Sequence, residues 1–206
     1  MTSLIFNNSK PISLEDESFR SKLLKIANTM NNVIPLGRGD PDFHTPQHIV
    51  NAAKKALDNN FHHYTPPSGV EELRESISKN FQNKFKLNYS KEEIIVTAGV
   101  QESIALAMLS TLNVDDEVLI TSPRFTTYDL AVRMCNAKPI PVPTYEKNNF
   151  SLMPEEISKR ITSKTKILVL VSPNNPTGAV TPPEKIIEIA EIIKKNNLIV
   201  IADEIY

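Results

Sequence analysis

From residue 94 onward the chain alternates short apolar runs with longer amphipathic stretches, and this rhythm restricts the fold more than any other feature. The apolar runs, which we expect to be strands, cover 94–97, 117–121, 138–142, 166–171 and 198–202. Continuous apolar strands are typical of sheets that are buried on both faces. Strands separated by helices pair in parallel through right-handed crossovers, so the sequence predicts an α/β three-layer sandwich with a largely parallel sheet.

The stretches outside these runs carry helical signals. Between the runs we expect helices within 103–112, 125–135, 153–161 and 181–196. The last of them would start with a capping box formed by Thr181 and Glu184. Earlier in the chain, three more helices are predicted over 13–31, 45–58 and 69–85, with Ser13 as a candidate cap.

Charge and composition exclude several classes of protein. The 206 residues include 23 Lys and Arg against 24 Asp and Glu, and no half of the chain is a basic block, which excludes nucleic-acid and anionic-membrane binding. The single cysteine, Cys135, excludes an internal disulfide framework. No apolar run approaches the roughly 18 residues of a membrane-spanning helix, and the N-terminus lacks a signal-peptide pattern. We therefore expect a cytoplasmic protein.

The chain has only five glycines, and all of them lie in loops. These loops cover 37–43, 64–69, 97–103 and 172–178, and a fifth segment, 203–206, directly follows the last apolar run. Parallel α/β sheets bind ligands outside the carboxyl ends of their strands. The loops are therefore where we expect functional residues.

The loop at 97–103 (TAGVQES) follows a predicted strand and opens a helix. Gly99 lets the backbone turn sharply, and the backbone N–H groups at a helix start form an anion site. An ordinary strand–helix turn has the same pattern, so a phosphate site is one of two interpretations.

The loop at 172–178 (SPNNPTG) is stiffened by Pro173 and Pro176, and Asn175 offers a side-chain amide to a ligand. A rigid turn without a ligand is the alternative.

The segment DEIY places Asp203 directly after an apolar strand. A carboxylate there is a structural cap, a metal ligand or the partner of a cationic ligand, whose protonation it would favour. Tyr206, three residues on, can donate a phenolic hydrogen bond.

Taken together and in order, these motifs are much more specific than any one of them. The chain carries GRGDPDF at 37, YTPPSG at 64, TAG at 97, NNPTG at 174 and DEIY at 203. The series resembles the class I aminotransferases, pyridoxal-5′-phosphate (PLP) enzymes of fold type I, from about Val33 to Tyr206. It is most similar to the branch that acts on aspartate or aromatic amino acids.

The resemblance implies a domain organisation. Residues 1–45 would be an N-terminal helical segment that contributes to the small domain and the substrate site. Residues 46–206 would form the PLP-binding large domain, truncated at its C-terminal end. The Ser122-Pro123 and Asn175-Pro176 bonds match bonds that are often cis in this family.

The resemblance also implies which residues hold the cofactor ring. Asp203 matches the aspartate that keeps the pyridinium nitrogen protonated, so that the ring acts as an electron sink. Tyr206 and Asn175 match the residues that bind the phenolic oxygen, and the asparagine that Asn175 matches is shared with the substrate carboxylate. Phe125 matches the aromatic residue that stacks on the ring beside the substrate.

Other residues match the contacts to phosphate and substrate. Val100 and Gln101 match the positions whose backbone N–H groups hold the phosphate, with Gly99 just before them. Tyr64 matches a tyrosine that reaches the phosphate of the neighbouring subunit, which implies a homodimer. Gly39 matches a glycine whose backbone lies against the substrate carboxylate.

The family's Schiff-base lysine and two anion-binding arginines lie beyond the position of Tyr206. The chain stops directly after an apolar strand, where functional residues are expected. We therefore expect a fragment that binds PLP weakly or not at all and does not transaminate by itself. The function implied for the whole protein is amino transfer between an amino acid and a 2-oxo acid.

Several alternatives stay open beside this hypothesis. The same cradle serves other fold-type-I reactions, such as C–S β-elimination, and a non-catalytic aminotransferase-like binding domain is a further possibility. Arg38 and Arg124 either favour a substrate with an acidic side chain or are ordinary surface residues.

The sequence does not support a dinucleotide-binding motif or a metal site. Gly37 and Gly39 lack the third glycine of a dinucleotide fingerprint. His44 and His48 are separated by a helix start and lack further ligands, so we expect no metal.

Overall fold

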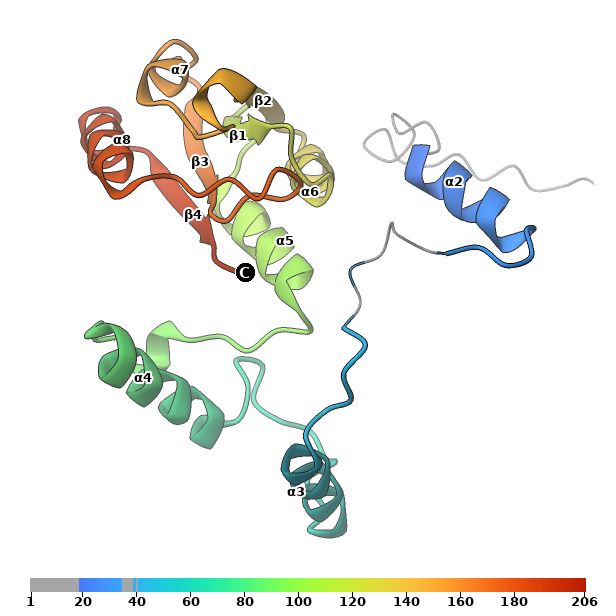
Figure 1. Ribbon diagram of the computed structural model, residues 1–206. Coiled ribbons are helices and arrows are strands. Elements are labelled where there is room, and N and C mark those ends of the chain that lie inside the picture. Colours follow the sequence, from blue (N-terminus) through green and yellow to red (C-terminus); the bar gives the residue numbers. More distant parts are fainter. Residues whose placement is uncertain (1–18, 35–38, 40) are drawn as a thin grey trace, which may run out of the picture. The chain divides into compact units, whose positions relative to one another are not determined.

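The computed structural model describes residues 19–34, 39 and 41–206, and the described chain divides into two compact units (Figure 1). One unit comprises the described part of 17–97, and the other comprises 98–206. The predicted division into residues 1–45 and 46–206 remains a prediction.

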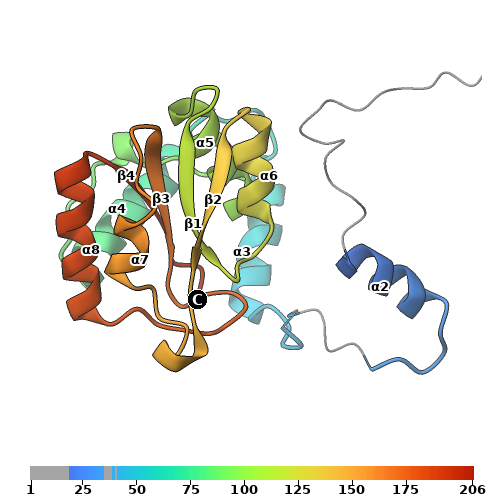
Figure 2. The same ribbon diagram turned by 90° about the horizontal axis from the view of Figure 1, so that it is seen from above.

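The unit of residues 98–206 is built on a four-stranded parallel sheet. Its strands are β1 (Glu117–Ser122), β2 (Lys138–Pro143), β3 (Thr165–Val171) and β4 (Ile199–Asp203). Their order across the sheet is β2-β1-β3-β4, as Figure 2 shows. Four of the five predicted strands are confirmed within one or two residues of the expected bounds.

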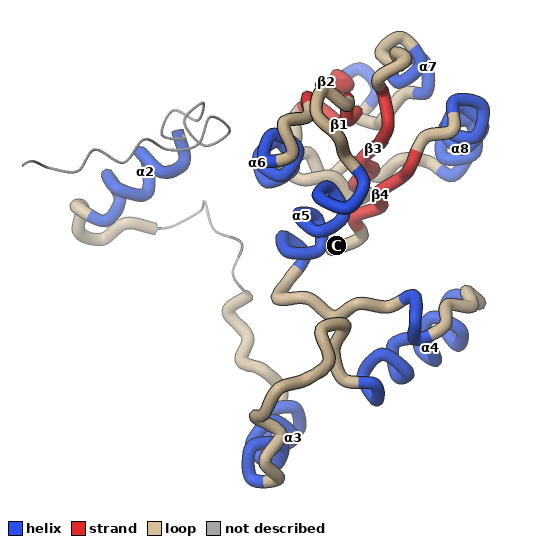
Figure 3. Tube along the Cα trace, turned by 180° about the vertical axis from the view of Figure 1, so that it is seen from behind, coloured by secondary structure: helices blue, strands red, loops and turns tan. Residues whose placement is uncertain are grey.

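Helices cover both faces of this sheet (Figures 1 and 3). Two helices, α5 (Val100–Thr111) and α6 (Thr127–Met134), lie on one face. Two others, α7 (Pro154–Ser158) and α8 (Pro183–Asn196), lie on the opposite face. A short 3₁₀ turn, η2 (Glu146–Asn148), follows β2. The predicted α/β three-layer architecture with a parallel sheet is therefore confirmed.

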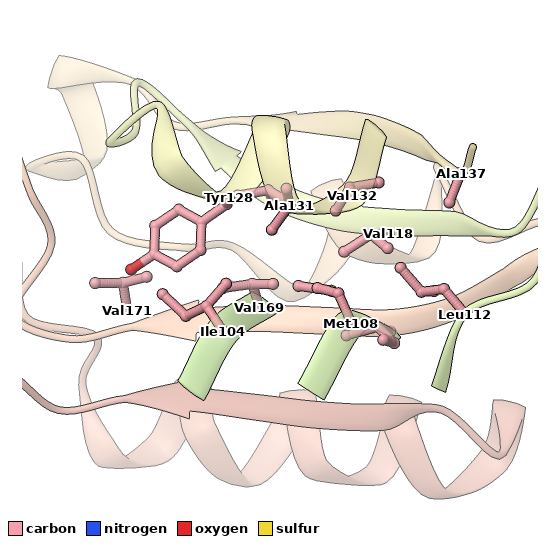
Figure 4. Close-up of a cluster of buried hydrophobic side chains, with 12 residues drawn as sticks. Ile104, Met108, Leu112, Val118, Tyr128, Ala131, Val132, Ala137, Val169 and Val171 are labelled. Atoms are coloured by element: carbon pink, nitrogen blue, oxygen red, sulfur yellow. The ribbon is translucent and has the colours of Figure 1, made fainter. Parts of the chain in front are cut away.

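The alternation of side chains along the strands produces two separate cores. In β1, Val118 (Figure 4) and Ile120 join the cluster under α5 and α6, while Leu119 joins Ile157 and Ile189 on the other face. All five of these side chains are at most 1% exposed. Because both faces of the central strands are buried, these strands appear in the sequence as unbroken apolar runs.

The other unit is helical. It contains α2 (Phe19–Asn28), α3 (Gln47–Asp58), α4 (Glu71–Phe85) and a 3₁₀ turn, η1 (Lys91–Glu93). These confirm the three predicted helices, although Ser13 lies outside the described residues. The Arg74 guanidinium ties α4 to η1 by donating to the carbonyl oxygen of Lys91 at 2.8 Å. No described helix in the chain is long and apolar enough to cross a membrane.

Two local predictions are wrong. Residues 94–97 do not form a strand, because they have no ladder partner. The N–H group of Val96 instead donates to the carbonyl of Ser68 at 3.0 Å. The capping box of α8 is absent as well. This helix begins one residue late, with Pro183 at the first position that proline favours, and the Thr181 N–H donates to Ser172 Oγ at 3.1 Å.

Candidate functional site

A cavity of about 150 Å³ lies at the carboxyl ends of β3 and β4 and beside the first turn of α5. This is the edge of a parallel sheet where ligands bind. Eleven residues line the cavity, and six of them are predicted cofactor-binding residues: Val100, Gln101, Phe125, Asn175, Asp203 and Tyr206. The fold therefore gathers residues that are about 100 positions apart in the chain.

Asp203, the last residue of β4, is buried and only 6% exposed. The Tyr128 hydroxyl donates to its Oδ2 at 2.6 Å, and the Ile205 N–H donates to its Oδ1 at 3.2 Å. Each carboxylate oxygen thus has one donor from the protein and keeps acceptor capacity for a further donor. A buried carboxylate beside a cavity is suited to pairing with a cationic ligand group.

Sequence reasoning missed Tyr128, which comes from α6 and stands in the core beside Ile104 and Val171 (Figure 4). Burial, followed by the hydrogen bond to Asp203, raises the pKa of the Tyr128 phenol. The hydroxyl therefore stays protonated and acts as a donor to the carboxylate. The available signal was its place on the apolar face of α6, because a buried tyrosine hydroxyl requires a polar partner.

Asn175 and Tyr206 lie together at a more open part of the site. The Asn175 Nδ2 donates to the Tyr206 Oη at 2.8 Å, although the two residues are 31 positions apart. They also line an adjoining hollow of about 350 Å³ with Pro176 and Gly178. Both peptide bonds that the resemblance marked as cis, Ser122-Pro123 and Asn175-Pro176, are cis, and Ser172-Pro173 is a third.

The start of α5 is where the sequence predicts an anion site. Its N-cap is Gly99, with a φ of 89° that favours glycine, and nothing lies within 4 Å of the position that a Cβ would take. Backbone conformation, not crowding, is therefore what demands glycine there. The side chain of Glu102 accepts a hydrogen bond from the N–H of Ala98, which precedes the cap. Val100 and Gln101, in the first turn, border the cavity.

Phe125 follows β1, lines the cavity and packs against the core cluster under α5 and α6. Its neighbour Arg124 is held by Asp129, with Nε to Oδ2 at 2.7 Å and Nη2 to Oδ1 at 2.5 Å. This guanidinium is engaged by the first turn of α6, whereas Arg38 lies outside the described residues.

Two predicted site residues belong to the other unit. Tyr64 and Gly39 are both exposed there, and their proposed roles remain predictions. Among the described residues, no group of three or more His, Cys, Asp or Glu side chains is arranged to hold a metal ion.

Comparison with known proteins decides the family. The model of the family described as aminotransferase class I and II matches residues 31–206. The chain belongs to this family. The predicted resemblance is thereby confirmed.

Relatives of known name support the same assignment. The chain is 43% identical over 200 residues to an aspartate aminotransferase from Pyrococcus abyssi, covering 96% of this chain and 51% of the relative. It is 40% identical over 186 residues to aromatic-amino-acid aminotransferase 2 from Thermococcus litoralis, covering 90% of this chain and 48% of the relative. The chain thus spans about half the length of the curated relatives it matches.

Among solved structures, the aspartate aminotransferase from Rhizobium meliloti superposes with a TM-score of 0.93 at 32% identity. The match covers 98% of this chain and 52% of that one. This similarity supports the α/β fold with a parallel sheet.

Proposed function

We propose that this chain forms the PLP-binding part of an aminotransferase that moves an amino group between an amino acid and a 2-oxo acid. The observation that carries the proposal is the buried Asp203 carboxylate, held by Tyr128 at the edge of a cavity that also borders the first turn of α5. This arrangement offers a negative charge and an anion site to one ligand.

The residues around the cavity fit the chemical groups of PLP. Asp203 would accept from the protonated ring nitrogen, and the first turn of α5 at Val100 and Gln101 would hold the phosphate. Asn175 and Tyr206, already within 2.8 Å of each other, would both donate to the phenolic oxygen. Phe125 would pack on the ring face.

PLP supplies an electron sink for charge that develops on the substrate. Asp203 would favour that charge by keeping the ring nitrogen protonated, because an opposite charge stabilises the protonated form. Tyr128 would orient this carboxylate, since its hydroxyl remains a donor over the physiological pH range. The apolar side chains of Ile104 and Val171, which line the cavity, would shield both interactions from water and so strengthen them.

The remaining parts of the activity are also proposals. The relatives are about twice as long as this chain, and we propose that transamination needs a lysine and arginines from the half that the chain does not span. The names of the relatives favour aspartate or an aromatic amino acid as the amino donor. Exposed Tyr64 would contact the cofactor phosphate of a second subunit in a homodimer.

A titration of the chain with PLP, followed by ³¹P NMR of the phosphate, tests the cofactor site. We expect weak binding that Asp203→Asn reduces by at least about tenfold, which corresponds to roughly 1.4 kcal/mol for a lost charge-assisted bond. Asp115→Asn, at an exposed carboxylate paired with Lys138, is the matched control and should leave the affinity unchanged. Equal affinities for the chain and Asp203→Asn would overturn the proposed site.

A chimera tests the reaction itself. Joining this chain to the second half of the Pyrococcus abyssi relative should give a protein that forms a 2-oxo acid from aspartate when a 2-oxo acid acceptor is present. Pyruvate release from a cysteine conjugate without amino transfer would instead favour C–S β-elimination.

A further inference from the structure

Asn174, beside the proposed ligand residue Asn175, is unusually well held. It is only 8% exposed, and its side-chain Nδ2 donates to Thr121 Oγ1 at 3.1 Å. Its Oδ1 accepts from the Thr177 hydroxyl at 3.0 Å. Its backbone N–H donates to the carbonyl of Ala179 at 2.9 Å, and its carbonyl accepts from the Gly178 N–H at 2.7 Å. Every polar group of Asn174 therefore has a partner.

The side-chain contact to Thr121 connects the loop after β3 to the neighbouring strand β1. Thr121 belongs to β1 and is 4% exposed, while Asn174 lies in the loop that follows β3. The two strands pair in register at Ile120 and Val169, so their carboxyl ends are adjacent. Thr121 and Asn174 are 53 positions apart in the sequence, and their hydrogen bond ties the loop after β3 to the sheet.

We propose that Asn174 is a positioning residue, which fixes the 172–179 loop to β1 so that the Asn175 amide stays directed at Tyr206. The neighbouring side chain does not contribute to this fixation, because Asn175 bonds only to the exposed Tyr206 hydroxyl among the interactions described. The part of the proposal that concerns PLP rests on the proposed function, whereas the geometry of the loop does not.

The two side-chain hydrogen bonds explain why asparagine suits this position. The contact to Thr121 uses the amide as a donor and the contact to Thr177 uses it as an acceptor. Only a side chain with both capacities meets the two requirements at once. Asparagine has few rotatable bonds, so holding it costs little conformational entropy.

NMR of the chain tests the geometry without any cofactor. In the wild-type chain, the side-chain amide protons of Asn175 should give cross-peaks to the Tyr206 ring, because Asn175 Nδ2 lies 2.8 Å from the hydroxyl oxygen that this ring carries. Asn174→Ala and Thr121→Val should both weaken these cross-peaks severalfold. Thr121→Ser retains the hydroxyl and should retain the cross-peaks. Thr126→Val, at an exposed threonine between β1 and α6, is the control and should retain them as well.

The outcomes separate the alternatives. Undiminished cross-peaks in folded Asn174→Ala would overturn the proposal, and Thr121→Val provides the same test if Asn174→Ala does not fold. Dispersed amide spectra establish folding in each variant.

PLP titration adds a test of how Asn174 acts. If it acts through Asn175, Asn174→Ala and Asn175→Ala should lower PLP affinity by the same factor, and the double variant should lose no more. Multiplied effects in the double variant would show an independent role and overturn the proposal. Absence of PLP binding by the chimera with the Pyrococcus abyssi second half would count against the proposed function, while the cross-peaks would still decide the role of Asn174.

Discussion

The two units of the chain contain similar amphipathic helices but differ in burial. Every residue of the described hydrophobic cores lies in the unit of residues 98–206. In the other unit, no described residue is buried, and apolar side chains such as Leu57 and Phe61 are 60% and 72% exposed. Helical pattern was therefore enough to form helices in both units, but only a sheet between helices produced a closed core.

The largest difference in stability between the two units should appear when one leucine in each is truncated to alanine. Leu119→Ala empties a site in the centre of the sheet that is 0% exposed and should lower the free energy of unfolding by about 2–5 kcal/mol. Leu57→Ala, at a leucine of α3 that is 60% exposed, should change it by less than about 0.5 kcal/mol. Urea unfolding followed by circular dichroism measures both. Equal losses would contradict the difference in burial.

The second contrast compares the cost in unfolding free energy of breaking one ion pair in each unit. Arg124 and Asp129 are 17% and 14% exposed and form two short bonds, so Asp129→Asn should cost about 1.5–3 kcal/mol. Lys79 and Glu75 of α4 are 72% and 43% exposed at 3.8 Å, so Lys79→Gln should cost less than about 0.5 kcal/mol. Urea unfolding followed by circular dichroism measures both costs. The prediction is refuted if Asp129→Asn destabilises the chain less than Lys79→Gln does.

Glycine positions give a third contrast. Gly99→Ala places a side chain at a φ of 89° and should cost about 1–3 kcal/mol of folding free energy. Gly39→Ala, at an open position of the other unit, should be neutral within about 0.5 kcal/mol. Thermal unfolding of the two variants tests whether the backbone at the start of α5 requires glycine.

The smallest effect concerns pH. Burial and Asp203 raise the pKa of Tyr128 above the ordinary value of 10.0, so the folded chain retains this proton after the unfolded chain has lost it. The resulting stabilisation is complete below pH 10 and is lost as the pH rises toward the raised pKa, by at most about 1.4 kcal/mol per pH unit.

Tyrosine variants isolate this contribution. Tyr128→Phe should flatten the fall in unfolding free energy between about pH 10 and about pH 11, whereas Tyr64→Phe, at a fully exposed tyrosine, should not. Urea midpoints collected across that range decide it. Identical slopes in wild type and Tyr128→Phe would assign the alkaline loss to other groups.

Much of the fold could be predicted, and the failures have a common cause. The apolar runs of β1 and β3 correctly predicted buried strands, because both strands are covered on two faces. Residues 94–97 have the same apolar character but no neighbouring strand, so the pattern alone overestimated the sheet. A strand needs a partner that its own sequence does not specify.

The candidate site shows the same division. Asp203, Asn175 and Tyr206 were predicted from motif resemblance, and the fold places all three around one cavity. Tyr128 and Thr121 were missed, because their polar contacts join residues 75 and 53 positions away. Neither residue has a local motif that would identify its partner.

The sequence by itself therefore determined the type and order of the elements, the loops that carry the candidate ligands and the family. Only the tertiary structure decided the order β2-β1-β3-β4, the support of Asp203 by Tyr128 and the attachment of Asn174 to Thr121. The physical reason is range. Periodicity and turn chemistry act between neighbours in the chain, whereas buried polar partners are chosen by the packing of distant segments.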